Sequence, residues 1–203
     1  MIGIVSYGMG NIQSVCNAFD YLDHETLVIT NPGDLDRVDK ILIPGVGAFP
    51  AAMEMINQTG FAAALDEQVL VKGKYVLGIC LGMQLLAEEG IEFERCRGLG
   101  WIPGRVDLIP RHGGSLRLPH VGWNELEAQG ECPLLRDIGS ETSCYFVHSY
   151  QLRVANENHI TATVDYGGPV TAAVAHNNIF GVQFHPEKSQ RVGLGILDNF
   201  ARL

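Results

Sequence analysis

The chain has 203 residues, of which 46% are hydrophobic and 18% charged, and its formal net charge is −9 at pH 7. This composition indicates a soluble globular protein with one domain, 1–203, and argues against disorder. The acidic balance argues against nucleic acid or an anionic membrane as the main partner. No apolar run could span a bilayer, and Met1–Ser6 lacks the basic start of a signal peptide, so we expect a cytoplasmic protein.

The first half of the chain alternates short apolar runs with longer amphipathic stretches. The runs predict strands at Ile2–Ser6, Thr26–Thr30, Ile41–Ile43 and Tyr75–Ile79. The stretches predict helices at Asn11–Leu22, Ala48–Gln58 and Phe61–Val71. Such alternation favours a parallel sheet flanked by helices, and runs without polar alternation are expected where both faces of a sheet are covered.

The second half consists mainly of short β-like runs: Val106–Ile109, Cys144–Val147, Ile160–Asp165, Val170–His176 and Ile179–Phe184. Turn residues separate them, among them Gly113-Gly114, Gly167-Gly168 and Asn177-Asn178, and the last pair predicts a tight hairpin. Gln190–Leu203 predicts an amphipathic closing helix. The expected fold is α/β, with an open, mainly parallel sheet flanked by helices and additional antiparallel strands in the second half.

Glycines and cysteines exclude several kinds of site. Tyr7-Gly-Met-Gly-Asn11 follows the first strand, but Gln13 stands where a dinucleotide fingerprint needs its third glycine, so we interpret the segment as a turn entering a helix. No metal or organic cofactor is indicated. The cysteines are odd in number and irregular in spacing, which fits a reducing compartment and gives no support to zinc or disulfide chemistry: Cys16, Cys80, Cys96, Cys132 and Cys144.

Cys80 lies where a predicted buried strand turns into a predicted helix. Gly78 and Gly82 flank it, and a nucleophile on such a turn needs small neighbours because the backbone is strained there. A thiol at a helix N-terminus is also favoured as thiolate. The alternative is a buried core thiol, which is the more common role of cysteine in apolar runs.

A base and its orienting group follow the last predicted strand. His185 could take the thiol proton, and Glu187, two residues on in an extended segment, could bond the other ring nitrogen. Taken singly, each could be an ordinary surface residue. Attack on an acyl carbon also needs backbone donors for an oxyanion. The amide of Leu81 and the Val46-Gly47 peptides are candidates, although Pro44-Gly-Val-Gly47 could equally be an ordinary glycine turn.

Three segments together resemble the class I (triad) glutamine amidotransferases: Gly78-Ile-Cys80-Leu-Gly82-Met-Gln84, Phe184-His185-Pro-Glu187 and Pro44-Gly-Val-Gly47. Five segments are similar to the histidine-pathway branch of that family, the glutaminase subunits of imidazole glycerol phosphate synthase: Tyr7–Asn11, Pro44–Phe49, Pro119–Asn124, Tyr145–Tyr150 and His185–Ser189. Other branches usually carry Pro-Gly-Gly in place of Pro-Gly-Val-Gly.

The resemblance implies that Cys80 attacks the side-chain amide of glutamine and that His185 protonates the ammonia, after which water hydrolyses the thioester. It implies substrate contacts at Gly47, Gln84, Glu92, His148, Ser149 and Tyr150. It further implies a heterodimer with a barrel-shaped cyclase subunit, in which the interface and ammonia exit involve Asn11, Pro119, Val121, Trp123, Tyr145 and Lys188.

Alternatives stay open at this point. Gln84 could be a polar residue on a helix face, and Trp123 could belong to the core. The acceptor of ammonia could be a sugar-amidating synthase, because acceptor chemistry belongs to the other subunit. The chain could also be a non-catalytic regulatory subunit or a cysteine sensor, although a sensor would not need His185 and Glu187.

Overall fold

An eight-stranded mixed sheet organises the molecule, in the order β2-β1-β3-β4-β14-β13-β12-β9. The computed structural model describes residues 1–111, 116–139 and 142–203. The strands of this sheet are β1 (Ile2–Val5), β2 (Thr26–Ile29), β3 (Lys40–Gly45), β4 (Tyr75–Cys80), β9 (Glu127–Ala128), β12 (Ile160–Asp165), β13 (Pro169–His176) and β14 (Ile179–Val182).

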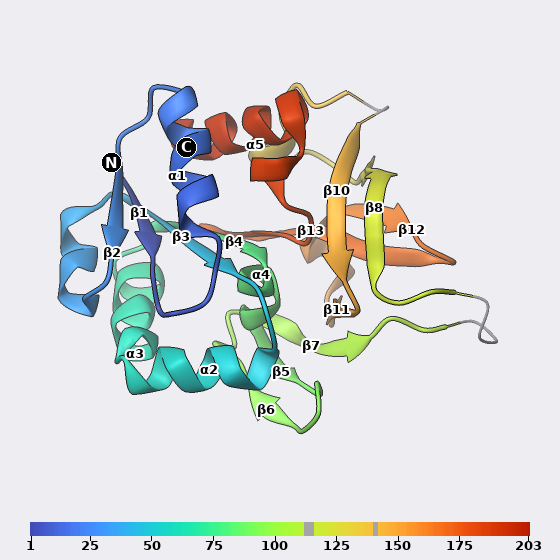
Figure 1. Ribbon diagram of the computed structural model, residues 1–203, viewed down its shortest axis with the longest axis horizontal. Helices are drawn as coiled ribbons and strands as arrows, with labels where there is room; N and C mark the ends of the chain where they lie inside the picture. The colour runs from blue at the N-terminus through green and yellow to red at the C-terminus, as the bar shows by residue number, and fades with distance from the viewer. Residues whose placement is uncertain (112–115, 140–141) are drawn as a thin grey trace.

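Helices cover both faces of this sheet (Figure 1). On one face lie α1 (Ile12–Tyr21) and α5 (Gln190–Arg202), and on the other α2 (Phe49–Gln58) and α3 (Phe61–Asp66). Each face has its own apolar core, one containing Phe19 and Phe200 and the other Phe49 and Phe61. None of the helices in the described ranges is both long and apolar enough to cross a membrane.

The five strands β2, β1, β3, β4 and β14 run parallel, as the apolar runs of the first half predict for the first four of them. Strand β3 is longer than expected, because Pro44 and Gly45 still pair with Ile79 and Cys80. Since parallel strands end at the same edge, the glycine loop after β3 lies directly beside Cys80.

The antiparallel strands lie in the second half of the chain. Strands β13 and β14 form the predicted hairpin, with His176 opposite Ile179 and Asn177 at a φ of 55°. A separate pair joins β8 (His120–Glu125) to β10 (Ser143–His148). A four-stranded sheet has the order β11-β7-β5-β6, with β5 (Ala87–Gly90), β6 (Cys96–Arg97), β7 (Ile102–Leu108) and β11 (Tyr150–Val154). The expected fold class is confirmed.

Several local expectations differ from the structure. The helix predicted at Phe61–Val71 is α3 followed by a π-helical turn, Glu67–Val71. Strands β5, β6, β8, β9 and β11 were not predicted, because they are short or carry glycine and charge where β-formers are expected. Within the described ranges, 3₁₀ segments lie at Pro32–Arg37, Pro133–Leu135, Glu157–His159 and Pro186–Lys188. The predicted turn at Gly113-Gly114 lies outside the described residues.

Candidate active site

Cys80 is the last residue of β4, and α4 (Leu81–Leu85) begins immediately after it. Its φ of 54° and ψ of −110° place a non-glycine residue in a rarely populated region of the backbone map. Strain of this kind is found at nucleophiles on strand-to-helix turns, where it projects the side chain out of the chain path. The side chain remains mostly covered, since Cys80 is 7% exposed.

Close backbone contacts explain the glycines that flank Cys80. A Cβ on Gly78 would lie 2.5 Å from the carbonyl oxygen of Gly82, and a Cβ on Gly82 would collide with the carbonyl oxygen of Ile43. Neither glycine has the positive φ that would otherwise require it. Both are therefore needed so that α4 can approach β4 and β3 closely.

The helix after Cys80 is shorter than the sequence suggests. It has five residues and leads directly into β5. Because the dipole of a helix sums over its aligned peptides, such a short helix contributes little to stabilising a thiolate. The expected dipole effect at Cys80 is thus weak, and other groups must stabilise its charge.

His185 and Glu187 form a buried pair beyond the end of β14. His185 Nδ1 lies 2.8 Å from Glu187 Oε1, and the two side chains are 3% and 1% exposed. The segment is held by the backbone and by Ser189: His185 N donates to the carbonyl of Tyr145 at 2.9 Å, and Ser189 Oγ donates to the carbonyl of His185 at 2.6 Å. Because β14 pairs in parallel with β4, this segment reaches the same sheet edge as Cys80.

The imidazole of His185 has an unusual protonation equilibrium. Burial lowers its pKa, but hydrogen bonding and charge from Cys80 and Glu187 outweigh burial and raise the pKa to about 9. Within the described residues, His185 Nε2 and Glu187 Oε2 are buried and have no partner that satisfies the geometric criteria for a hydrogen bond. At neutral pH the site therefore favours an imidazolium between a carboxylate and the sulfur.

A cavity of about 340 Å³ opens onto Cys80 and His185. Its wall contains every residue for which substrate contact was expected: Gly47, Gln84, Glu92, His148, Ser149 and Tyr150. The predicted oxyanion residues Val46 and Leu81 also line it, as does Pro119. Gly47 has a φ of 106°, and a Cβ there would lie 2.6 Å from Met9 Cε, so only glycine fits this bend of the loop.

Two of these residues are already engaged within the protein. Gln84 Nε2 donates to the carbonyl of Tyr150 and to Gln183 Oε1, each at 3.0 Å. Both amide hydrogens of Gln84 are thus used within the protein. Glu92 Oε2 accepts a hydrogen bond from the amide of Phe49 at 2.7 Å, so its carboxylate satisfies the first turn of α2 while lining the cavity.

His148 lines the cavity as a neutral imidazole. Burial lowers its pKa to about 4, with a smaller lowering from the charges of His120 and His185. Its Nδ1 lies 2.8 Å from the carbonyl of Tyr150. A carbonyl only accepts, so Nδ1 carries the proton. His185 is therefore the imidazole that carries charge in this cavity at neutral pH.

Three of the residues expected at a partner interface and ammonia exit, Trp123, Tyr145 and Lys188, form a group beside the cavity, which we call the exposed aromatic group. Trp123 and Tyr145 pair across β8 and β10 with ring centroids 6.0 Å apart, and Lys188 Nζ lies 5.9 Å from the Tyr145 ring. Trp123 is 48% exposed and Val121 55%, so a core role for Trp123 is wrong. Asn11 caps α1 through a bond from the amide of Ser14.

Two buried polar residues near Cys80 were not predicted. Gln183 is fully buried, and its Nε2 lies 3.7 Å from Cys80 Sγ. Tyr7 is 1% exposed, and burial and then the charge of Cys80 raise its pKa, so its hydroxyl stays protonated. The available signal for Gln183 was a single polar residue inside the apolar run Ile179–Phe184.

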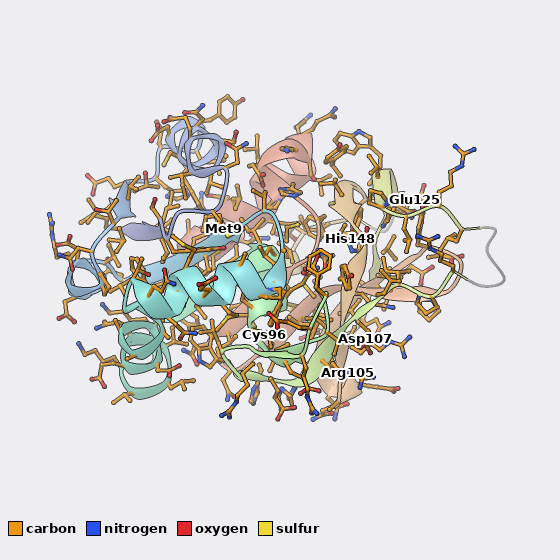
Figure 2. The ribbon with its side chains drawn as sticks, turned by 60° about the horizontal axis from the view of Figure 1, so that its bottom comes forward. Met9, Cys96, Arg105, Asp107, Glu125 and His148 are labelled. Carbon is orange, nitrogen blue, oxygen red and sulfur yellow. The ribbon has the colours of Figure 1, made fainter. Side chains whose placement is uncertain are left out.

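A larger hollow of about 850 Å³ lies over β5, β6 and β7 and contains none of the expected site residues. Four arginines line it together with acidic residues, and Figure 2 shows Arg105 and Asp107 side by side there, apart from His148. Arg105 Nε pairs with the Asp107 carboxylate at 2.9 Å. Three of its arginines pair with Glu89 or Asp107, and neither Cys80 nor His185 lines it, so the hollow is a less suitable reaction site than the cavity at Cys80.

Comparisons with known proteins agree with this geometry. The family model for class I glutamine amidotransferases matches residues 4–202. The imidazole glycerol phosphate synthase subunit HisH 1 of Campylobacter jejuni is 45% identical over all of both chains. The subunit HisH of Ruegeria pomeroyi is 44% identical, covering 98% of this chain and 97% of its own.

Solved structures share the fold at lower identity. PurLQS from Thermotoga maritima matches with a TM-score of 0.78 and 17% identity, over 99% of this chain and 97% of that chain. A crystal structure of a glutamine amidotransferase matches with a TM-score of 0.76 and 18% identity, over 100% and 99%. From the family model and the full-length relatives it follows that the chain belongs to the class I glutamine amidotransferases, in the branch of the HisH subunits.

Proposed function

We propose that this protein hydrolyses glutamine to glutamate and ammonia with Cys80, His185 and Glu187, and that it passes the ammonia to a barrel-shaped cyclase subunit that makes imidazole glycerol phosphate. One observation carries the proposal: a cavity of about 340 Å³ presents a strained cysteine beside a buried His185–Glu187 pair. We also propose that the chain acts as one domain in the cytoplasm.

In the first half-reaction, the thiolate of Cys80 attacks the amide carbon of glutamine and the carbonyl oxygen becomes an oxyanion. The amide of Leu81 and a peptide of the Val46-Gly47 loop stabilise that oxyanion. The imidazolium of His185 then donates its proton to the nitrogen, the C–N bond breaks, and ammonia leaves a thioester.

The second half-reaction uses the same histidine as a base. Once the sulfur is acylated, its negative charge is gone, so one of the two groups that raise the pKa of His185 no longer acts. His185 is already neutral, because it has given its proton to ammonia, so it can take a proton from water. Water attacks the thioester carbon, and glutamate leaves as Cys80 is regenerated. Glu187 keeps the ring oriented and balances its charge in both halves.

The partner follows from the exposed aromatic group and from the names of the relatives. Large, half-exposed aromatics such as Trp123 commonly anchor interfaces. Ammonia released without an acceptor is wasted, and the oxyanion loop is rich in glycine. We therefore expect low activity alone and strong stimulation by the cyclase subunit with its ligand bound.

The deciding experiment measures glutamate release by the chain alone and with a cyclase subunit and its ligand. Strong stimulation supports the proposal, and full activity in isolation contradicts the expected coupling. Absence of glutamate release in both conditions refutes the glutaminase function. Rescue of a histidine auxotroph that lacks its own glutaminase subunit identifies the pathway, and failure to rescue by an active enzyme favours a sugar-amidating partner.

Truncating Trp123 to alanine is expected to weaken binding of the cyclase subunit by about 30-fold, a typical loss for an aromatic anchor. Isothermal titration calorimetry measures the Kd directly. Val28→Ala is the matched control, because Val28 is 41% exposed on β2, at the opposite end of the molecule from β8 (Figure 1). Equal Kd values for the two variants would place the interface elsewhere.

Replacing Glu187 with glutamine is expected to move the alkaline limb of kcat/KM to lower pH. The proton on His185 is needed for ammonia to leave, so activity falls as pH rises through the pKa of His185, which is about 9. Glu187 is one cause of the raised value, and its loss should shift the limb by about one to two pH units. A pH–rate profile of the complex measures this, and an unshifted limb would show that Glu187 does not act on His185.

A further inference from the structure

The side-chain amide of Gln183 points at the reacting sulfur. Gln183 Nε2 lies 3.7 Å from Cys80 Sγ, within the range of a hydrogen bond to sulfur, and Gln183 has no solvent exposure. We propose that Gln183 is a catalytic residue that donates a hydrogen bond to the thiolate of Cys80, and that Gln84 is the positioning residue that keeps its amide in this orientation. The proposal rests on the glutaminase function proposed above.

A backbone carbonyl determines which way both amides face. The carbonyl of Tyr150 can only accept, so the atom of Gln84 that lies 3.0 Å from it must be the NH₂ group. The second hydrogen of that group points to Gln183 at 3.0 Å, where it requires an oxygen. Gln183 therefore turns its oxygen to Gln84 and its own NH₂ group to Cys80. The hydrogen bonds from the Tyr150 carbonyl through Gln84 and Gln183 to Cys80 form a relay. If Gln183 alone were flipped, its NH₂ group would face the NH₂ group of Gln84. If both amides were flipped, the oxygen of Gln84 would face the oxygen of the Tyr150 carbonyl.

The carbonyl that starts this relay is itself held in place. His148 Nδ1 donates to it at 2.8 Å, and His148 Nε2 lies 3.1 Å from His120 Nδ1. Tyr150 also begins β11, which pairs with β7. The Tyr150 carbonyl accepts from both donors, which leaves the Gln84 amide a single satisfied arrangement.

This relay can stabilise the negative charge on the sulfur of Cys80, to which the short helix α4 contributes little. A hydrogen bond to a charged acceptor is stronger than one to the neutral form, so the Gln183 N–H favours thiolate over thiol. His185 exchanges a proton with the reactants, whereas the Gln183 amide does not titrate. It also restricts the direction of Sγ before substrate arrives, because a buried donor constrains the side chain that it binds.

The test measures the pH dependence of Cys80 alkylation by iodoacetamide, followed by peptide mass so that the other four cysteines do not interfere. Gln183→Met keeps the approximate size and removes the donor. The pH midpoint of its alkylation is expected to rise by about one pH unit. At a pH below the midpoints of the parent and the variant, the variant should be alkylated about tenfold more slowly. Gln183→Glu keeps the bond from Gln84 but places an oxygen beside the sulfur, so its midpoint should rise further.

Gln84→Met is expected to raise the midpoint less than Gln183→Met, because it frees the Gln183 amide to rotate without removing it. Gln68→Met is the matched control: Gln68 is also buried, at 5% exposed, but its Nε2 donates to Asp36 Oδ1 at 2.8 Å, away from the cavity. Its alkylation midpoint should equal that of the parent protein.

A folded Gln183→Met protein with an unchanged midpoint would overturn the proposal. Loss of packing alone would not raise the alkylation midpoint most in Gln183→Glu, less in Gln183→Met and least in Gln84→Met. Should that variant not fold, the midpoints of Gln183→Glu and Gln84→Met decide by the same criterion. The alkylation assay needs no substrate. Failure of the parent protein to release glutamate with its partner would therefore refute the proposed function without deciding the Gln183 bond, and the two outcomes are distinguishable.

Discussion

Replacing Cys80 with serine is expected to abolish glutamine hydrolysis, with kcat/KM falling by roughly 10⁴-fold or more. A serine hydroxyl is far less acidic than a thiol, and the imidazolium of His185 is matched to a thiolate, with a pKa raised to about 9 partly by Cys80 itself. Without that charge His185 loses one of its two stabilising partners. Glutamate release in the presence of the cyclase subunit measures the effect.

Stability should hardly change in this variant. Serine is close to cysteine in size and can adopt the same strained backbone, so the free energy of unfolding should stay within about 1 kcal/mol of the parent value. Cys96→Ser is the matched control: Cys96 is half-buried on β6 and does not line the cavity at Cys80, so activity should be retained. An active Cys80→Ala protein would exclude Cys80 as the nucleophile.

Replacing Gly82 with alanine is expected to lower the free energy of unfolding by about 3 kcal/mol or more. The new Cβ would collide with the carbonyl oxygen of Ile43, which belongs to the backbone of a central strand and cannot rotate away as a side chain could. The helix must then move off β3, and Cys80 and Leu81 move with it. Urea unfolding measures the loss, and glutaminase activity should fall in any fraction that folds.

Gly195→Ala is the matched control, since the same change makes no collision there. Gly195 is inside α5, and a Cβ there would meet Ile138 Cδ1 at 3.6 Å, an ordinary contact. Alanine is the better helix former, so this variant should be more stable by about 0.5–1 kcal/mol. A Gly82→Ala protein as stable as the parent would show that α4 can shift without cost.

Local patterns predicted most of the parallel half of the fold. The strand before Cys80, the hairpin at Asn177-Asn178 and the closing helix follow from periodicity and turn residues, which act over a few neighbouring positions. The strands β5, β8 and β11 were missed for the same reason. Their stability comes from partners distant in the chain, and a segment such as Ala87–Gly90 has little preference for a strand by itself.

The residues of the candidate site also divide into those that local patterns predicted and those that they did not. The glycine-flanked Cys80 is visible in the sequence because the steric demands of its turn are local. So is the His185–Glu187 pair, because its residues lie two positions apart, although Pro186–Lys188 forms a 3₁₀ turn and not the expected extended segment. The role of Gln183 was not visible, because its meaning depends on Gln84 and on the carbonyl of Tyr150, which three separate elements bring together.

The sequence by itself determined the fold class and the family and predicted Cys80 as the nucleophile, since each depends on periodicity, motif or local sterics. The tertiary structure alone decided four further points. The β4–β14 pairing brings His185 to Cys80, and α4 is too short to provide a dipole. Trp123 is exposed, and a buried amide points at the sulfur. The physical reason is that these features arise from strand order and packing, which act between residues that no local pattern connects.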